Sequence, residues 1–314
     1  MPFRTRNTNT VDILDAAQTA ALLPWTPLIE TLEATMLDYA AGKILCPERQ
    51  TLMPPGREGV MLSMPSAAAD VFCHKLVTVY PGNAAHNLPA IHGVVTCGDA
   101  RDGRTILSLD GPTVTARRTA AVTFVAIRRL LPAPPRSVLL IGTGVQAQAH
   151  VEGLFTLWPD IRVTAQGRSV ERERALRAAT DSRVALSHEA VERGQQDATH
   201  DAVVIATTAR EPVYDLPGRA GALVVGLGAF RPDMAEIGPA TLESSALYVD
   251  DPHGAPSEAG DLIQAGIDWN RVRPLASALA APPDSRVPVV CKTVGCAAWD
   301  LAACRTALGF SGAQ

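Results

Sequence analysis

The chain has 314 residues, of which 47% are hydrophobic and 19% charged, with a mean hydropathy of +0.10. This composition excludes a disordered chain, and the length suits two domains, although one large α/β unit would also fit. A formal net charge of -4 and a pI near 6.0 leave no broad basic surface, so we expect a small-molecule substrate and no nucleic acid partner.

The amino-terminal residues MPFRTRNTNT are polar, and the acids Asp12 and Asp15 follow, so this start lacks the apolar segment of a signal peptide. No apolar run reaches the roughly 18 to 20 residues that a membrane-spanning helix needs. The six cysteines contain no CxxC pair, so we expect reduced, mostly buried thiols and no metal site. These features predict a cytoplasmic protein without a membrane partner.

Residues 1–130 read as an α+β domain. A helical stretch is predicted at 21–41, and strands are predicted at 71–80, 91–97 and 105–109. The stretch LLPAPPR at 130–136 follows, and its prolines stop a helix and stiffen a connection. We therefore expect a domain boundary there.

Residues 131–286 alternate short β-branched runs with helical stretches, which is typical of βαβ units around a parallel sheet. The predicted strands are 137–141, 161–165, 202–207, 222–227 and 246–249. Crossover helices are predicted at 146–158 and 170–179. The predicted fold class is α/β, a doubly wound Rossmann sheet with a second α+β domain. A tail at 287–314, with a short strand and a helix from about 295, is expected to return to the first domain.

The first strand of this region runs directly into a glycine-rich turn, formed by Gly142, Thr143, Gly144, Val145, Gln146 and Ala147. The first glycine permits a tight turn, the second lets the backbone approach a pyrophosphate, and the alanine allows the next helix to lie on the strand. A glycine turn without a ligand is the alternative. The position between strand and helix favours a nicotinamide dinucleotide, and hence an oxidoreductase.

The second strand ends in Ala-Gln-Gly, followed by Arg168 and Ser169. Sites that prefer NAD usually carry an acid at this strand end, where it binds the ribose hydroxyls. Without that carboxylate, and with Arg168 and Ser169 able to bind a 2'-phosphate, NADPH is the expected cofactor and NADH the alternative. A solvated surface arginine is the simpler interpretation of Arg168.

Several segments, in order along nearly the whole chain, resemble the ornithine cyclodeaminase and mu-crystallin family. The segments are Pro47-Glu48-Arg49, His74 to Asn83, Leu107 to Gly111, Thr115 to Ala121, the glycine turn, Cys291-Lys292-Thr293-Val294-Gly295 and Asp300-Leu301-Ala302. The resemblance implies that Arg49, Lys75 and Arg118 bind a substrate carboxylate. A buried cation is costly unless an anion meets it, and an amino-acid carboxylate would be such an anion. An internal salt bridge is the alternative for any one of them alone.

The same resemblance places His92 near the substrate. An imidazole there could protonate an imine, and Lys75 is an equally good candidate for the proton donor. A structural role is the commoner one for a lone histidine. His74 alternates with Lys75 along its predicted strand and is expected on the opposite face.

The resemblance fails at one informative position. Cyclodeaminases and related alanine dehydrogenases carry an Asp shortly after the glycines that end the fourth strand, and alignment on Glu236 places Phe230 there. A phenyl ring cannot take a proton. Asp233 lies nearby, and we interpret it as a turn residue. The expected function is therefore reduction of cyclic ketimine carboxylates, 1-pyrroline-2-carboxylate or 1-piperideine-2-carboxylate, to proline or pipecolate, with Phe230 as an apolar wall of the substrate site.

Ornithine cyclodeaminase, or an amino-acid dehydrogenase of the same family, is the alternative within the enzymes, and Phe230 argues against both. A non-catalytic, NADPH-binding mu-crystallin-like protein is the alternative outside them. The three cations argue against it, because cofactor storage needs none of them. The family also implies a homodimer formed through the first domain.

Overall fold

The computed structural model describes residues 10–192 and 199–309, and the chain divides into two compact units. Unit 1 combines the residues up to Arg118 with those from Cys296 onward, and unit 2 runs from Thr119 to Gly295. The division falls inside the continuous helix α3 (Gly111–Leu130), twelve residues before the start of the proline-rich stretch where we expected it. The outermost residues of the predicted first domain, 1–9 and 310–314, lie outside the described residues.

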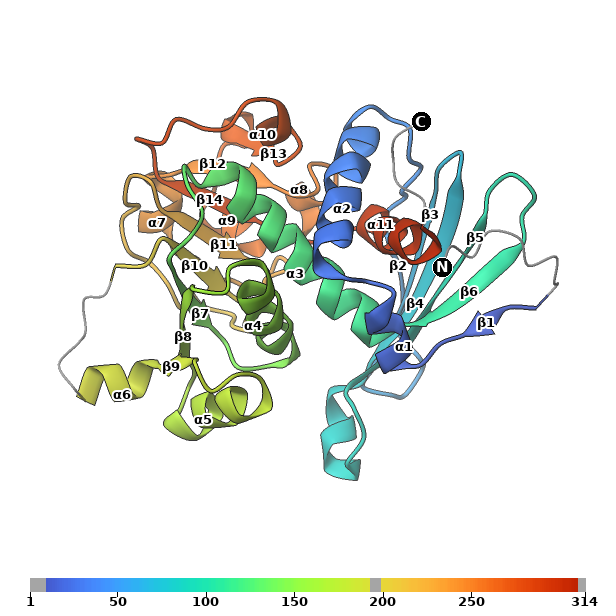
Figure 1. The fold of residues 1–314 in the computed structure, drawn as a ribbon, viewed down its shortest axis with the longest axis horizontal. Coiled ribbons are helices and arrows are strands. Elements are labelled where there is room, and N and C mark those ends of the chain that lie inside the picture. Colours follow the sequence, from blue (N-terminus) through green and yellow to red (C-terminus); the bar gives the residue numbers. More distant parts are fainter. Residues whose placement is uncertain (1–9, 193–198, 310–314) are drawn as a thin grey trace. The chain divides into compact units, whose positions relative to one another are not determined.

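Unit 1 contains a six-stranded mixed sheet in the order β1-β6-β5-β4-β3-β2 (Figure 1). Its strands are β1 (Asp12–Ile13), β2 (Gln50–Leu52), β3 (Val60–Ala67), β4 (Val71–Val79), β5 (Ile91–Asp99) and β6 (Thr105–Asp110). All neighbours pair antiparallel except β1 with β6. Along β4 buried and partly buried residues alternate, so one face of the sheet is buried and the other is partly exposed.

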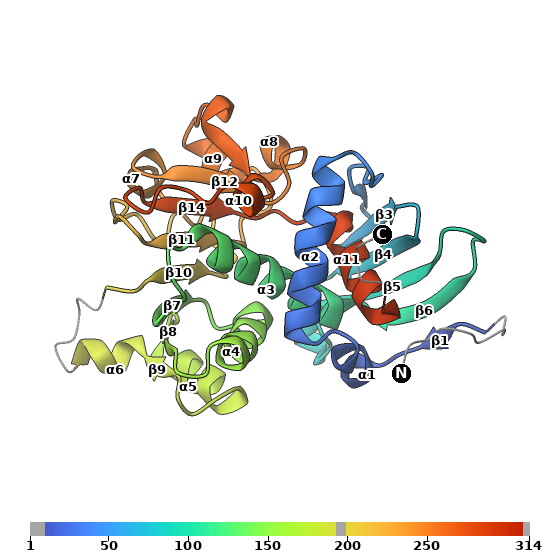
Figure 2. The same ribbon diagram turned by 45° about the horizontal axis from the view of Figure 1, so that its top comes forward.

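The helices of unit 1 are α1 (Ala16–Ala21), α2 (Trp25–Ala40), the first part of α3 and α11 (Ala297–Leu308). Asp15 and Gln18 form a capping box that starts α1. The single helix predicted at 21–41 is interrupted before Pro24, because the residue before a proline disfavours helical backbone. Helix α11 lies against α2 and against the sheet at β3, β4 and β5, as Figure 2 shows for α2.

Unit 2 contains an eight-stranded, entirely parallel sheet in the order β13-β12-β14-β11-β10-β7-β8-β9. The strands are β7 (Ser137–Ile141), β8 (Arg162–Gln166), β9 (Ala185–Leu186), β10 (Ala202–Ile205), β11 (Leu223–Gly226), β12 (Ala246–Val249), β13 (Val272–Pro274) and β14 (Val289–Lys292). The five strands predicted for this region are all present, and the doubly wound Rossmann fold is confirmed. Strand β14, which we expected in the first domain, lies inside this sheet instead. Its four residues are fully buried, and parallel neighbours supply hydrogen bonds on both sides.

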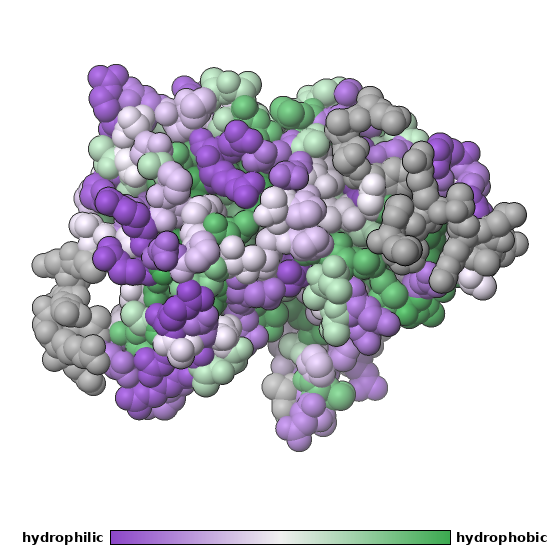
Figure 3. Space-filling view, viewed as in Figure 1, coloured by the Kyte–Doolittle hydropathy of each residue, from purple (hydrophilic) through white to green (hydrophobic). Residues whose placement is uncertain are grey.

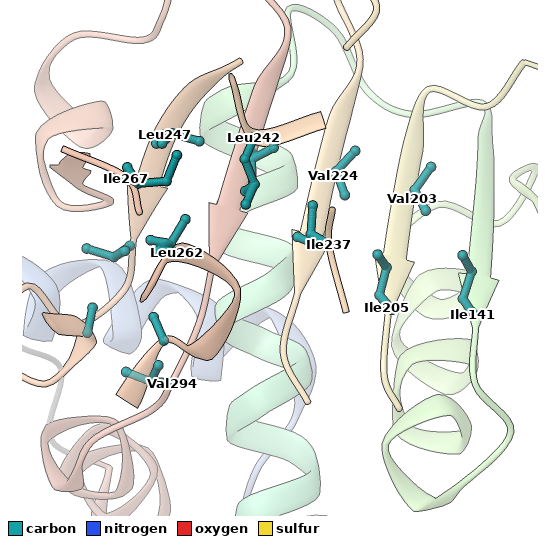
Figure 4. Packing of buried hydrophobic residues seen from close by; sticks show 14 residues of the cluster. Ile141, Val203, Ile205, Val224, Ile237, Leu242, Leu247, Leu262, Ile267 and Val294 are labelled. Atoms are coloured by element: carbon teal, nitrogen blue, oxygen red, sulfur yellow. The ribbon is translucent and has the colours of Figure 1, made fainter. Parts of the chain in front are cut away.

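The helices of unit 2 are α4 (Val145–Leu157), α5 (Val170–Ala179), α6 (Ser187–Glu192), α7 (Pro239–Glu243), α8 (Ala255–Glu258), α9 (Gly260–Gln264) and α10 (Ser277–Ala280). One buried cluster joins the strands to α7, α8 and α9. In Figure 4 the strand residues Ile141, Val203, Ile205 and Val224 lie on the same face of the sheet, toward this cluster. This core fixes the strand ends from which the loops after β7, β10 and β11 leave.

His150 on α4 is fully buried and lies edge-on to Phe124 of α3. Its Nδ1 is 2.7 Å from the carbonyl oxygen of Gln146, and its Nε2 is 3.0 Å from Thr123 Oγ1. Burial lowers the pKa of His150 to about 4, so the ring is neutral. We interpret His150 as a core residue that joins α3 to α4.

Five of the six cysteines are buried, Cys46 is partly exposed, and all six are free. In the described part of the chain, no helix is both long and apolar enough to cross a membrane. Hydrophilic and hydrophobic side chains are mixed on the surface in Figure 3. The surface also includes large exposed apolar side chains, among them Ile13, Met53 and Leu45.

Candidate active site

The glycine-rich turn lies between β7 and α4, where the order of strands in the unit 2 sheet reverses. The chain continues from β7 to β8 on one side, whereas β10 occupies the other side. Gly142 has a φ of 121°, and a Cβ there would lie 2.2 Å from the carbonyl oxygen of Ala206, just beyond β10. Only glycine, which has no Cβ and readily adopts a positive φ, can occupy this position. The turn therefore lies at the switch point where doubly wound sheets bind their ligands.

The remaining residues of the turn leave its backbone accessible. A Cβ at Gly144 would meet no atom within 4 Å, and Gly144 caps α4 without any side-chain hydrogen bond to the free N–H groups. Val145 is 64% exposed, and Thr143 and Gln146 are partly exposed. Ala147 is fully buried, where it lets α4 lie on the strand. Open N–H groups at the start of a thirteen-residue helix suit a pyrophosphate.

The loop after β8 lies against the glycine turn, because a Cβ at Gly167 would lie 2.9 Å from Thr143 Cγ2. Arg168 is exposed at this strand end, and Ser169 caps α5. A hydrogen bond from Ser169 is the largest cause that lowers the pKa of Glu171. The Ser169 hydroxyl therefore already has an acidic neighbour.

Glu173 holds this loop from inside the unit. Its fully buried carboxylate accepts hydrogen bonds from the Gly167 N–H at 2.9 Å and from the His188 N–H at 3.1 Å, and it pairs with His188 Nδ1 at 2.7 Å. These contacts occupy the carboxylate within the protein. Glu173 thus does not replace the ribose-binding acid that is missing after β8.

The loop after β11 carries Phe230 and is held by the buried carboxylate of Glu236. This carboxylate accepts hydrogen bonds from the Gly228 N–H at 2.6 Å and the Ala229 N–H at 3.2 Å, and also from the Thr207 N–H at 2.7 Å, in the loop after β10. A Cβ at Gly228 would lie 1.8 Å from the Thr207 carbonyl oxygen, so the two loops are in close contact. Glu236 therefore sets the backbone that carries Phe230.

Phe230 is 40% exposed at the surface of this loop. Asp233 lies in the following turn and forms an exposed ion pair with Arg231, with Nη2 to Oδ2 at 2.7 Å. The prediction that Asp233 is a turn residue is confirmed. Its carboxylate has an exposed partner of its own, so it does not replace the acid absent at position 230.

Lys292, at the end of β14, completes the network around Glu236. Its Nζ is 2.9 Å from Asp261 Oδ2 and 3.7 Å from Glu236 Oε2, and all three side chains are fully buried. Asp261 Oδ1 accepts hydrogen bonds from the Glu236 and Ile237 N–H groups. Burial is the largest cause that raises the pKa of Glu236, and Lys292 opposes it. We call these three side chains the Lys292 network.

Three of the residues predicted to bind substrate lie in unit 1, around the carboxylate of Asp300. Lys75 Nζ on β4 is 2.7 Å from Asp300 Oδ2, and Arg118 Nε on α3 is 3.3 Å from Asp300 Oδ1. Arg49 lies close enough for its charge to affect Lys75. We call Arg49, Lys75, Arg118 and Asp300 the Asp300 cluster. It contains three cations and one anion, a net charge of +2.

The chemistry of Lys75 follows from its surroundings. Burial is the largest cause that lowers its pKa, Asp300 raises it, and Arg118 and Arg49 lower it further. A lowered pKa brings an ammonium group closer to neutral pH, where it is a better general acid. The cluster as a whole can therefore hold an anion and supply a proton.

His92 does not join this cluster. In the β4–β5 register His92 pairs with Thr78, three residues from Lys75, so His92 and Lys75 lie on opposite faces of the sheet. His92 is exposed, whereas the Lys75 face is buried. The register thus separates His92 from Lys75, and the approach of His92 to the substrate stays a prediction. His74 also lies on the opposite face, as predicted, with Nε2 2.9 Å from Ser63 Oγ.

Three buried residues at the two sites received no role from the sequence: Asp300, Asp261 and Lys292. The sequence nevertheless contained a signal for Asp300 and another for Lys292. Asp300 stands in the otherwise apolar turn AAWDLAA, where a lone acid needs a buried partner. The chain contains only three lysines, Lys43, Lys75 and Lys292. Two of them, Lys75 and Lys292, are buried.

The comparison with protein families matches residues 10–279 to the ornithine cyclodeaminase/mu-crystallin family. The chain is 50% identical, over 301 residues and 95% of each protein, to a Delta(1)-pyrroline-2-carboxylate/Delta(1)-piperideine-2-carboxylate reductase of Azospirillum brasilense. It is 30% identical over 287 residues to the ketimine reductase mu-crystallin of Rattus norvegicus, covering 88% of this chain and 90% of the relative.

Solved structures share the fold. A Delta(1)-pyrroline-2-carboxylate reductase of Thermococcus litoralis, in complex with NADH and L-proline, superposes with a TM-score of 0.82 at 24% identity, covering 96% of this chain and 97% of the other. A probable ornithine cyclodeaminase from Bordetella pertussis Tohama I gives a TM-score of 0.80 at 25% identity, over 95% and 96% of the two chains.

Proposed function

Since the chain belongs to the ornithine cyclodeaminase/mu-crystallin family, we propose that it is a nicotinamide-dependent reductase of small cyclic ketimine carboxylates. Half of its residues are identical to those of a relative named for both the five-membered and the six-membered substrate. The observation that carries the proposal furthest is the Asp300 cluster, whose net charge of +2 suits a carboxylate. The products would be proline and pipecolate.

The substrate carboxylate is held by Arg49, Lys75 and Arg118. Arginine offers paired N–H groups that match a carboxylate, and the two buried cations gain most from an anion because their surroundings are poor in water. A carboxylate also lowers the excess positive charge of the cluster. Charge supports this role for all three residues, and burial supports it for Lys75 and Arg118.

Lys75 is the proton donor. Reduction of the imine adds a hydride to carbon and a proton to nitrogen, and a bound nicotinamide supplies the hydride. Lys75 lies in the carboxylate-binding cluster, and burial lowers its pKa from the usual 10.5. His92, on the other face of the sheet, is left out of this step.

Phe230 forms an apolar wall of the substrate site. A carboxylate at this position could accept a proton or pair with an amine, as deamination of ornithine would need, and a phenyl ring can do neither. The Asp233 carboxylate is paired with Arg231 and offers no substitute. The loop therefore favours reduction of an imine over loss of ammonia.

The glycine turn binds the pyrophosphate of the dinucleotide through the open N–H groups from Gly144 to Gln146, and Arg168 favours NADPH over NADH. No described carboxylate at the end of β8 is placed to repel a 2'-phosphate except Glu171, which lies beside Ser169. A preference for NADPH is thus expected to be moderate rather than absolute.

A second copy of this chain covers the outer face of the unit 1 sheet and makes a homodimer. By strand register, three large apolar side chains share the face opposite Lys75: Ile13 is 80% exposed, Leu52 is 53% exposed and Val94 is 42% exposed. An apolar sheet face is an ordinary dimer surface. The free cysteines suit a reducing compartment such as the cytoplasm.

The test is a steady-state assay of purified protein with 1-pyrroline-2-carboxylate and 1-piperideine-2-carboxylate, each with NADPH and NADH. Oxidation of the nicotinamide, with proline or pipecolate formed in equal amount, is expected. Ornithine with NAD⁺, monitored for ammonia, tests the cyclodeaminase alternative. Ammonia release, or cofactor binding without turnover of either ring size, would overturn the proposal.

A further inference from the structure

Asp300 lies in the first turns of α11, the helix by which the end of the chain lies against the unit 1 sheet. Its side chain has no exposed surface, and its two oxygens face Lys75 and Arg118. A buried carboxylate without cations would cost several kcal/mol, so the pairing is needed for Asp300 itself. The question is what the pairing does for the two cations.

We propose that Asp300 is a positioning residue for ketimine reduction: it holds Lys75 in its ammonium form and aims Arg118 at the substrate carboxylate. The inference rests on the proposed function. Asp300 meets Arg118 at Nε, and within the described residues no hydrogen bond engages the two terminal nitrogens of this guanidinium. These are the nitrogens that grip a carboxylate in a paired arrangement.

The charges around Lys75 explain why an anion is needed there. Arg49 and Arg118 both repel its ammonium group, and arginine does not lose its proton in proteins, so any relief of repulsion has to come from Lys75. Without Asp300 the buried cations Lys75 and Arg118 would face each other with no anion between them, and Arg49 would add to the repulsion of Lys75. Lys75 would then lose its proton and with it the ability to donate one.

The other titratable groups near Lys75 do not take over this role. Cys73 on β4 and Cys97 on β5 share the Lys75 face of the sheet, and Cys304 lies one turn beyond Asp300 on α11. Burial raises the pKa of Cys304, with Cys73 and Cys97 as its hydrogen-bonding neighbours, so this thiol stays neutral. Asp300 is therefore the anion that faces Lys75 among the described residues.

The proton balance of the step is simple. The imine C=N bond becomes CH–NH as a hydride arrives at carbon, one Nζ–H bond of Lys75 breaks, and one N–H bond forms on the substrate. Asp300 occupies one side of the Lys75 ammonium group at 2.7 Å, which leaves other N–H bonds for the substrate. Water returns a proton to Lys75, and Asp300 favours that return.

The scarcity of lysine makes a direct test practical. Protein labelled with ¹³C at lysine Cε gives resonances from three side chains, of which Lys43 is exposed and serves as an internal reference. In Asp300→Asn, Lys75 should titrate about one pH unit or more below its wild-type value, while Lys43 and Lys292 stay unchanged. The alkaline fall of kcat/KM for 1-pyrroline-2-carboxylate should move to lower pH by the same amount.

Asp70→Asn is the matched control. Asp70 forms an ion pair with Arg305, which lies on α11 as Asp300 does, with Arg305 Nε 2.9 Å from Asp70 Oδ2. Asp70 takes no part in the Asp300 cluster. This variant should leave the Lys75 titration and the pH profile unchanged. An unchanged Lys75 titration in Asp300→Asn, in protein that retains its circular dichroism, would overturn the proposal.

Should Asp300→Asn fail to fold, Asp300→Glu carries the test. It retains the charge but displaces the carboxylate, so the Lys75 titration should remain near that of the wild type while kcat falls. If Lys75 in Asp300→Glu titrated at a pH as low as complete loss of the charge would cause, the proposal would be contradicted. The NMR titration needs no substrate, so it remains decisive for Asp300 even if the wild type reduced no ketimine and the proposed function failed.

Discussion

Each unit of this protein buries one lysine beside an aspartate, but the two surroundings differ in charge and in hydrogen bonding. In unit 1 Lys75 and Arg118 share the single carboxylate of Asp300, and Arg49 lies close enough to repel Lys75. In unit 2 Lys292 faces two carboxylates, Glu236 and Asp261, which leaves a net charge of -1.

The carboxylates of the Lys292 network also accept hydrogen bonds from backbone N–H groups. Glu236 accepts them from the loops after β10 and β11, and Asp261 accepts them from the residues that follow Ala235. These hydrogen bonds hold the backbone of the two loops, and of the residues that follow Ala235, in place. In the Asp300 cluster the contacts of the Asp300 carboxylate are with the side chains of Lys75 and Arg118. The comparison teaches that a buried lysine beside an aspartate can either hold backbone in place or belong to a group of cations, and its other neighbours decide which.

The largest effect expected from this comparison is on catalysis. Lys75→Met should lower kcat/KM for 1-pyrroline-2-carboxylate by about 10³-fold, because both a carboxylate contact and the proton donor are lost. NADPH binding, measured by fluorescence, should be unchanged, since the glycine turn lies in unit 2. Lys43→Met, at the exposed lysine, is the control. A loss smaller than tenfold would remove Lys75 from the proton-donor role.

Lys292→Met tests the other side of the comparison. It leaves two buried carboxylates without their cation, so the free energy of unfolding should fall by about 3–5 kcal/mol in a urea titration. Lys75→Met should cost less stability, because Arg118 still pairs with Asp300 and repulsion between cations is relieved. If Lys75→Met proved the more destabilising of the two, the division into a binding cluster and a structural brace would be wrong.

His150 provides a smaller, pH-dependent effect in unit 2. Burial lowers its pKa from 6.5 to about 4, so the unfolded chain takes up the proton first as the pH falls. The neutral ring therefore contributes stability above pH 6.5, and this contribution is lost progressively between pH 6.5 and 4, by about 3 kcal/mol in total.

Urea titrations at several pH values measure this contribution. His150→Gln should abolish its part of the slope, whereas the exposed His92→Gln should leave both the slope and ketimine reduction unchanged. An identical pH dependence in wild type and His150→Gln would refute the assignment. Loss of activity in His92→Gln would return that histidine to the catalytic step.

The smallest predicted effect concerns cofactor choice. Arg168→Ala should raise the KM for NADPH about tenfold and leave the KM for NADH nearly unchanged, because a single exposed arginine contributes to binding of the 2'-phosphate. Arg162→Ala, at the amino end of the same strand, is the matched control. Equal changes in the KM for NADPH and for NADH would mean that Arg168 does not bind the 2'-phosphate.

Much of unit 2 could be predicted because its signals are local. The apolar runs of β7 and β12 and the glycine turn stand in consecutive residues, so strand, turn and helix could be identified without any tertiary contact. Strand β14 was harder to place. Its run of four buried residues lies far along the chain from its partners, and only the pairing with β11 and β12 shows to which sheet it belongs.

The candidate site shows the same division. Lys75 and Arg118 could be identified as cations in segments that resemble the family, and Phe230 as a residue that departs from it. The separation of His92 from Lys75 could not be seen in the same way, because it depends on the register between β4 and β5, and a shift of one residue exchanges the faces of a strand.

By itself the sequence determined the Rossmann fold, the position of the glycine-rich turn and the cations of the candidate site, since each depends on residue type and short-range order. Only the tertiary structure decided which anion those cations meet, because Asp300 is 225 residues from Lys75 along the chain and reaches it through the packing of α11 on the sheet. The same holds for Lys292, whose partners lie on the loop after β11 and on α9. Buried charges are balanced in space, and the order of residues along a chain does not record that balance.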